Sequence, residues 1–300
     1  YGRVIGRSER YTIITGKGYR PRLLKLGFWR WPAFALAVAY LLLSTLGPFL
    51  VLAYTSFLKF LQVPSRRAFA SMSWENYETV FATDQLGNTL WNTLVMTAAV
   101  ATGTVVLSFL ISLVVVRSRF WGRKLLDQLS FIPHAIPGIV MGLALLWIFL
   151  QVDKLGFDLF GSLTSLVIAF VIGYISYGTR AMNSAMLQIH KDLEEAARIS
   201  GAPDWRVMWR VFCPLLLPAL TGVWIWTMLH VIRAAGKPLI LADGASNEVL
   251  AVVIWNMWDE GYVEAVGAIG TMMMLALLAI VIALRSLGFG RGAHIQGESR

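Results

Sequence analysis

The sequence has few charged residues, one cysteine and four histidines, and each scarcity excludes a class of protein. Only 14% of the 300 residues are charged and the mean hydropathy is +0.64, which is too apolar for an ordinary soluble domain. The single cysteine, Cys213, excludes an intrachain disulfide. His134, His190, His230 and His294 show no metal-ligand spacing, so an integral-membrane metalloenzyme has no visible site.

Asp, Glu, Lys and Arg are absent from six long runs, and these runs predict membrane helices. They cover residues 31–58, 85–116, 128–152, 159–179, 211–232 and 265–284. The shortest run has 20 residues, and at about 1.5 Å per residue it spans roughly 30 Å, the thickness of the hydrocarbon core. We therefore predict an all-α integral membrane protein with six transmembrane helices. The prolines and glycines of "FIPHAIPGIVMG" predict a break in the third helix.

Lysine and arginine are distributed unevenly over the loops, which predicts the orientation. The N-terminal tail, the 117–127 and 180–210 loops and the C-terminal tail carry 20 of these residues, and the other three loops carry 6. The positive-inside rule then places both termini and the 180–210 loop in the cytoplasm. Residues 1–31 contribute +7 of the net charge of +9. A basic flank on a membrane helix indicates contact with anionic lipid, not nucleic acid.

One loop is densely charged, "HKDLEEAARISGAPDWRVMWR" at 190–210. Asp192 can act as an N-cap with Glu195 as its capping-box partner. Gly201 can adopt the left-handed position that ends a helix, and Pro203 prevents continuation. These signals predict a short helix with alanines at its centre. On local chemistry alone, such a helix is either a docking element for a partner or a solvated surface loop.

The spacing within and after this helix carries a resemblance. Glu195-Ala196-Ala197, three residues, Gly201, nine residues and then "VFCP" at 211–214 resembles the EAA motif of ABC-transporter permeases. That motif runs Glu-Ala-Ala, three residues, Gly, nine residues, Ile, any residue, Leu-Pro. Val211 is a conservative replacement of the isoleucine, and Cys213 departs from the leucine.

The resemblance extends over nearly the whole chain. "GKGYRPR", "FIPHAIPGIVMGLAL" and "LQIHKDLEEAARISGA" are similar to binding-protein-dependent permeases of the ferric-iron type, and the chain looks most like the second half of a fused permease. The resemblance implies the type I ABC importer permease fold with a cytoplasmic coupling helix. We expect a basic linker at 1–31, a six-helix permease domain at 32–287 with its core near 88–285, and a cytoplasmic tail at 288–300.

The resemblance also implies partners and roles. A cytoplasmic ATPase dimer would contact the coupling helix through five positions: Glu194, Glu195, Ala196, Ala197 and Gly201. The permease itself would have no catalytic residue, bound metal or cofactor, because ATP and magnesium would sit on the ATPase. Further expected partners are a second permease half, an extracytoplasmic solute-binding protein and membrane lipid. The expected location is the bacterial plasma (inner) membrane, with several crossings.

The solute and its path are less well specified. His134, Asn183 and Arg233 are candidate pathway or gate residues, while hinge, packing and anchoring roles are alternatives for them. The resemblance favours ferric iron. However, Ala234 occupies a position where ferric-type relatives commonly have an acid, and Lys237 adds a base. A phosphonate, polyamine or thiamine-like solute therefore stays open.

Two other classes remain as alternatives, a secondary transporter and an integral-membrane enzyme. A secondary transporter usually has an ionisable residue within a span for coupling. The charge-free runs contain only His134 and His230, both near the ends of their runs. A membrane enzyme would need clustered catalytic or ligating side chains, which the sequence does not display.

Overall fold

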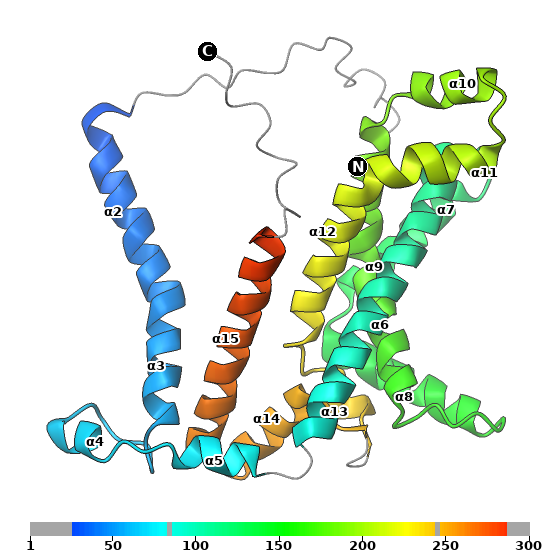
Figure 1. The fold of residues 1–300 in the computed structure, drawn as a ribbon. Coiled ribbons are helices and arrows are strands. Elements are labelled where there is room, and N and C mark those ends of the chain that lie inside the picture. The colour runs from blue at the N-terminus through cyan, green and yellow to red at the C-terminus, as the bar shows by residue number, and fades with distance from the viewer. Residues whose placement is uncertain (1–25, 83–85, 244–246, 287–300) are drawn as a thin grey trace. The chain divides into compact units, whose positions relative to one another are not determined.

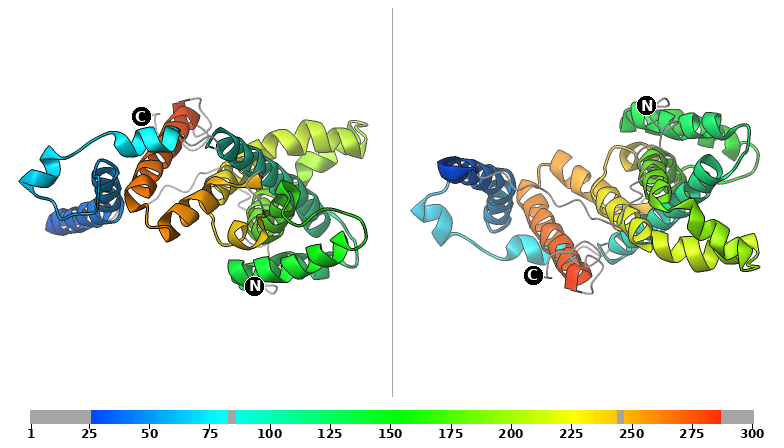
Figure 2. Two further views of the ribbon diagram at one scale, coloured as in Figure 1. Left: turned by 90° about the horizontal axis from the view of Figure 1, so that it is seen from below. Right: turned by 90° about the horizontal axis from the view of Figure 1, so that it is seen from above.

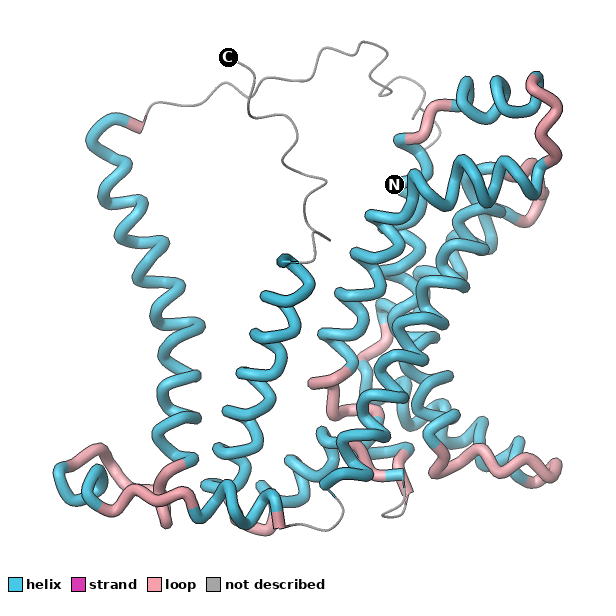
Figure 3. Tube along the Cα trace, viewed as in Figure 1, coloured by secondary structure: helices cyan, strands magenta, loops and turns pink. Residues whose placement is uncertain are grey.

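The computed structural model describes residues 26–82, 86–243 and 247–286, and all regular elements in these ranges are helices (Figure 3). Five described helices are long and apolar enough to cross a membrane, and a bent pair of helices makes a sixth crossing if it is counted as one span. The predicted all-α membrane architecture is confirmed. Most of the predicted N-terminal linker and the predicted C-terminal tail lie outside the described residues.

The described chain forms two compact units, coloured by residue number in Figure 1. The first unit contains residues up to 82 and residues 256–282. Its helices are α2 (Arg30–Leu41), a π-helical turn (Leu42–Leu46), α3 (Gly47–Ser56), α4 (Arg66–Ala70), α5 (Glu75–Phe81) and α15 (Val263–Ser286). α2 and α3 form the first apolar span with the turn between them.

Polar contacts at the end of α3 join the elements of the first unit. The amide of Asn76, in α5, donates to the backbone carbonyls of Ser56 and Leu58 at 2.9 and 2.7 Å. These carbonyls follow the last turn of a helix and need partners from elsewhere. On α15, a Cβ at Gly267 would lie 2.6 Å from Oγ1 of Thr55. The missing side chain at Gly267 therefore allows α15 to approach α3 closely.

The second unit contains the described residues 86–255 and the last described residues, 283–286. Its helices are α6 (Leu86–Ser112), a π-helical turn (Leu113–Arg117), α7 (Arg123–Phe131), a 3₁₀ turn (Ile132–Ala135), α8 (Gly138–Asp153), α9 (Leu163–Gln188), α10 (Lys191–Ile199), α11 (Asp204–Val207), a π-helical turn (Met208–Phe212), α12 (Cys213–Val231), α13 (Pro238–Leu241) and α14 (Leu250–Asp259), which begins in this unit.

Small residues allow α6 and α9 to pack closely along most of their length. The buried face of α6 is rich in threonine and serine, and the opposing face of α9 includes Gly178. A Cβ at Gly178 would overlap Oγ of Ser108 on α6. Helices in a membrane associate through such close backbone approach, because the lipid offers no hydrophobic driving force between them.

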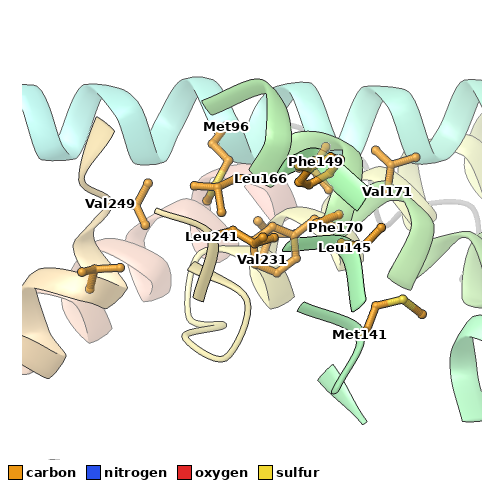
Figure 4. Close-up of a cluster of buried hydrophobic side chains, with 13 residues drawn as sticks. Met96, Met141, Leu145, Phe149, Leu166, Phe170, Val171, Val231, Leu241 and Val249 are labelled. Carbon is orange, nitrogen blue, oxygen red and sulfur yellow. The ribbon is translucent and has the colours of Figure 1, made fainter. Parts of the chain in front are cut away.

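An apolar core joins the other elements to this pair. Met96 of α6, Phe149 of α8, Phe170 of α9, Val231 of α12 and Leu241 of α13 lie in one cluster of buried side chains (Figure 4). The core holds α13 and the connection before it against α8 and α9.

The third crossing is broken, as the prolines and glycines predicted. α7 with its 3₁₀ turn and α8 meet at 111°, and Pro137 stands at the junction. Proline fixes its backbone and has no N–H, so the helical hydrogen bonds cannot run through this point. The hydroxyl of Ser176, on α9, donates to the carbonyl of Ser130 at 2.8 Å. A backbone group near the break is thereby satisfied inside the protein.

Candidate functional site

The charged loop folds into a helical hairpin made of α10 and α11 with the turn between them, hereafter the hairpin. It lies beyond the ends of α9 and α12, where the chain leaves one long helix and returns to the next (Figure 1). Two further views show it extending to the side of those helices (Figure 2). The predicted short helix is confirmed as α10.

The N-terminal cap of α10 differs from the sequence prediction. α10 begins at Lys191, so Asp192 lies inside the helix and His190 occupies the cap position. Nδ1 of His190 lies 3.4 Å from the backbone nitrogen of Asp192 and 3.0 Å from its carboxylate. The predicted cap at Asp192 was wrong because the helix starts two residues earlier than the usual preference for serine, threonine, aspartate or asparagine at the cap suggested.

The C-terminal end of α10 follows the prediction. Gly201 has a φ of +77°, in the left-handed region that glycine adopts without steric cost. The backbone N–H of Ala202 donates to the carbonyl of Ala197 at 3.1 Å, which is the bond typical of a glycine-ended helix. A Cβ at Gly201 would touch nothing within 4 Å. The backbone conformation alone therefore selects glycine there.

Two faces of α10 have different surroundings. Ala197 is half-buried and packs on a cluster formed by Met186, Val207 and Phe212. Glu195 and Ala196 are exposed, and Ile199 on the same face is 86% exposed. Glu194 also belongs to α10, but its side chain lies outside the described part of the structure. Of the five predicted contact positions, Glu195, Ala196 and Gly201 therefore lie on the accessible surface, and Ala197 faces its own molecule.

The hairpin continues directly into a membrane helix. α11, a π-helical turn and α12 make one apolar span from Trp205 to Val231. Pro214 has no N–H to give to the preceding turn. The backbone there takes π geometry, in which Cys213 N–H donates to the carbonyl of Met208. A displacement of the hairpin would thus be passed to α12 through continuous helix.

Sequence reasoning missed the arginine that ties the hairpin to its base. Arg117, the last residue of the π-helical turn that follows α6, donates from Nη2 to the carbonyls of Met186 and Ile189 at 2.8 and 2.7 Å. Met186 lies in the last turn of α9, where its carbonyl also accepts from the Ile189 N–H at 3.2 Å, and Ile189 is the residue that follows the helix. The guanidinium also lies over the ring of Phe212 at 5.0 Å. Arg117 therefore connects the ends of three membrane helices beneath the hairpin.

Asn183 belongs to a second polar cluster, hereafter the clamp, made of Asp127, Arg180 and Asn183. Nη1 of Arg180 lies 3.1 Å from Oδ1 of Asp127, and the amide of Asn183 donates to the same oxygen at 3.2 Å. The guanidinium also lies over the ring of Phe131 at 4.9 Å. The clamp fixes α7 to α9. This arrangement favours the anchoring role for Asn183 over the pathway role.

The other two pathway candidates are separated. His134 lines a cavity with a volume of about 230 Å³, together with Tyr174 and Lys237. Arg233 is exposed and is not among the residues that line this cavity. Among the described residues, no group of three or more histidine, cysteine, aspartate or glutamate side chains is arranged to hold a metal ion.

These features can be compared with known proteins. The family model described as "Binding-protein-dependent transport system inner membrane component" matches residues 104–288, which include the broken span, the hairpin and the cavity. The chain belongs to this family. The family is that of ABC-transporter permeases, so this chain is a permease subunit of an ABC importer, and such subunits are non-catalytic.

Its relatives transport different solutes. The chain is 28% identical to the spermidine/putrescine permease PotC of Haemophilus influenzae over 78% of this chain and 88% of that protein. It is 27% identical to the sulfate permease CysT of Escherichia coli over 76% and 86%. It is 25% identical to the ferric permease FbpB of Actinobacillus pleuropneumoniae over 71% of this chain, but it spans only 31% of that longer protein.

Solved structures support the same fold. A bacterial ABC transporter for the acidic polysaccharide alginate has a chain that matches with a TM-score of 0.68 and 16% identity, over 90% of this chain and 96% of that one. The MetNI methionine ABC transporter matches with a TM-score of 0.52 and 19% identity, over 68% and 92%. The predicted type I importer permease fold is confirmed.

Proposed function

We propose that the hairpin docks on a cytoplasmic ATPase dimer and transmits its ATP-driven closure to α9 and α12. The observation that supports this most strongly is the apolar, exposed face of α10. Leu193 is 49% exposed and Ile199 86% exposed, beside the small residue Ala196. Exposed apolar side chains next to a small residue suit a protein groove better than water. This favours docking over a solvated loop.

The hairpin is attached to the membrane helices in a way that would transmit motion to them. One end follows α9, the other continues into α12, and Arg117 ties both to α6. Densely packed cores and interfaces move as rigid bodies when a force is applied, because they deform little internally. A hairpin fixed at three helix ends would therefore move the helices with it.

The proposal includes further partners and an orientation in the membrane. We infer that a second permease half faces this one, that a solute-binding protein delivers solute from outside the membrane, and that the hairpin lies on the cytoplasmic side of a bacterial inner membrane. The 180–210 loop, which contains the hairpin, and the 117–127 loop carry more lysine and arginine than the loops on the other side, which supports that orientation. ATP with magnesium would bind to the ATPase and not to this chain.

Membership of the permease family does not by itself identify the solute of this chain. The resemblance to ferric-type permeases favoured iron, but the names of the relatives include ferric ion, polyamines and sulfate. Ferric ion and polyamines are cations, and sulfate is an anion. Iron is therefore one of several candidates, and the chemistry of the cavity must separate them.

The docking proposal is tested by coupling in the assembled transporter. We expect Gly201→Asp and Glu195→Arg each to lower solute uptake per ATP hydrolysed at least tenfold. The first strains the left-handed turn, by about 1–2 kcal/mol, and the second reverses a charge on the exposed face. Uptake and ATP hydrolysis are measured together in proteoliposomes.

Two matched controls separate docking from general damage. Gly156 also has a positive φ, +92°, with nothing within 4 Å of a built Cβ, and it lies between α8 and α9 away from the hairpin. Gly156→Asp and Glu78→Arg, which alters an exposed acid of α5, should keep normal coupling. Normal coupling in both hairpin variants would refute the proposal.

A further inference from the structure

Lys237 is a charged residue of the second unit whose side chain is buried. It lies in the connection between α12 and α13, and only 8% of its surface is exposed. Its side chain packs against the middle of α9, where a Cβ at Gly173 would overlap Nζ. Glycine at this position is thus what makes room for the ammonium group.

The surroundings of the ammonium are aromatic and apolar. Nζ lies 4.8 Å from the ring centre of Phe170 and 5.5 Å from that of Tyr174. Among the residues that the structure describes, no carboxylate lies within ion-pair distance of Lys237. The cation–π contacts offset part of the cost of burying the charge, but an ammonium without an anionic partner remains expensive to bury.

The same ammonium borders the cavity of about 230 Å³. The cavity is lined by apolar and small residues with three polar side chains, those of His134, Tyr174 and Lys237. A water occupies about 30 Å³ in the liquid, so the volume suits a small solute or one headgroup. A buried ionisable side chain without a carboxylate partner that borders a cavity is a candidate functional site.

The charge state of Lys237 is compatible with binding an anion. Lys237 lies outside the apolar spans, and its burial lowers its pKa to about 8. The ammonium form therefore still predominates at pH 7. Protonated lysine has three N–H donors and no acceptor, which suits an oxyanion.

We propose that Lys237 binds an anionic group of the transported solute in this cavity, so that the solute is a small oxyanion or carries a phosphoryl, sulfonyl or carboxyl group. A bare ferric ion or a polyamine would be repelled at the same place. This inference rests on the proposed transport function and specifies its substrate class. It runs against the expectation of ferric iron from the sequence resemblance.

Direct binding tests the proposal without a need to know the natural solute. The permease assembled with its second half and the ATPase, in nanodiscs without nucleotide, is unfolded by heat in sodium sulfate or sodium methylphosphonate. Sodium chloride of equal ionic strength is the reference, and spermidine chloride is the cation arm. We expect a saturable rise in the midpoint temperature with an oxyanion and none with spermidine.

The variants locate the effect. Lys237→Met should raise the half-saturating oxyanion concentration at least tenfold, because it removes a charge-assisted hydrogen bond. Lys237→Arg should retain part of the binding. Lys154→Met, which alters an exposed lysine with a contact to Gln151, should bind as the wild type does. Gly173→Ala keeps the lysine but displaces its ammonium, so it should weaken binding even if Lys237→Met is produced poorly.

Oxyanion stabilisation that is equal in wild type and Lys237→Met, or stabilisation by spermidine alone, would overturn the inference. The coupling assay on Gly201→Asp gives a separate answer. Loss of anion binding in Lys237→Met together with normal coupling in both hairpin variants would support the cavity site and refute the docking proposal. Lost coupling in the hairpin variants without any effect of Lys237→Met on anion binding would do the reverse.

Discussion

Arg180 and Lys237 are two cations in the second unit, and they are accommodated in opposite ways. Arg180 has a carboxylate, a carbonyl and an aromatic ring around its guanidinium, all from α7. Among the described residues, the ammonium of Lys237 faces the aromatic rings of Phe170 and Tyr174 and borders an open cavity. A charge with its partners in the same chain holds the fold together. A charge whose partner is missing from the described chain leaves room for a ligand.

The largest effect is expected from breaking the clamp. Arg180→Met leaves the carboxylate of Asp127 without its cation, and removing one partner of a buried pair is strongly destabilising. Because both side chains of the pair keep some exposure, we expect a loss of about 2–3 kcal/mol in the free energy of unfolding. Unfolding in mixed detergent micelles measures it, with Arg233→Met at an exposed arginine as the control.

A double-mutant cycle sharpens this prediction. Asp127→Leu together with Arg180→Met removes both charges and should recover much of the lost stability, because no charge is left alone. Losses that simply add would mean that the two residues act independently and that the clamp is not the reason for their placement.

Arg117 should show an intermediate effect with a functional signature. Arg117→Met removes two hydrogen bonds to the end of α9, and we expect a loss of about 1–2 kcal/mol in unfolding free energy. The expected fall in uptake per ATP is larger than this loss explains, since the base of the hairpin loosens. Arg117→Lys should recover only part of the coupling, because one ammonium nitrogen can donate to both carbonyls but lacks the planar guanidinium that lies over Phe212. Coupling that follows stability alone would contradict this role.

The smallest effect on stability is expected at Lys237. Lys237→Met removes a buried charge that has no carboxylate partner among the described residues. The unfolding free energy should stay unchanged or rise by up to about 1 kcal/mol, although anion binding is lost. Unfolding in mixed detergent micelles measures this change. A loss of unfolding free energy as large as that of Arg180→Met would mean that Lys237 stabilises the fold as Arg180 does. The proposed difference between the two cations would then be wrong.

Local signals in the sequence predicted the fold well. Runs without charge locate membrane helices because the bilayer penalises charge everywhere along a span. Pro137 predicted the break because proline fixes its backbone and has no N–H, and Gly201 predicted the end of α10 because glycine adopts the left-handed conformation without steric cost. The cap at His190 was missed because histidine is not among the residues usually preferred at the start of a helix.

Contacts between distant segments could not be predicted from the sequence. Asn183 meets Asp127 only because α7 folds back on α9, and a lone aspartate in a basic loop gave no sign of this. Lys237 looked like a base in an external loop. Its burial depends on Gly173, on another helix, and on the broken third span that opens the cavity. Tertiary packing, and not local propensity, sets such environments.

The most direct test of the account is a cross-link between the hairpin and the ATPase. The one cysteine, Cys213, is first replaced by alanine, and Ala196→Cys is then placed on the exposed face of α10. Leu155→Cys, at a side chain that is 76% exposed in the connection between α8 and α9, serves as control. The account predicts that a short bifunctional reagent joins the permease to the ATPase through position 196 and not through 155. No cross-link at 196 in a complex that hydrolyses ATP would contradict it.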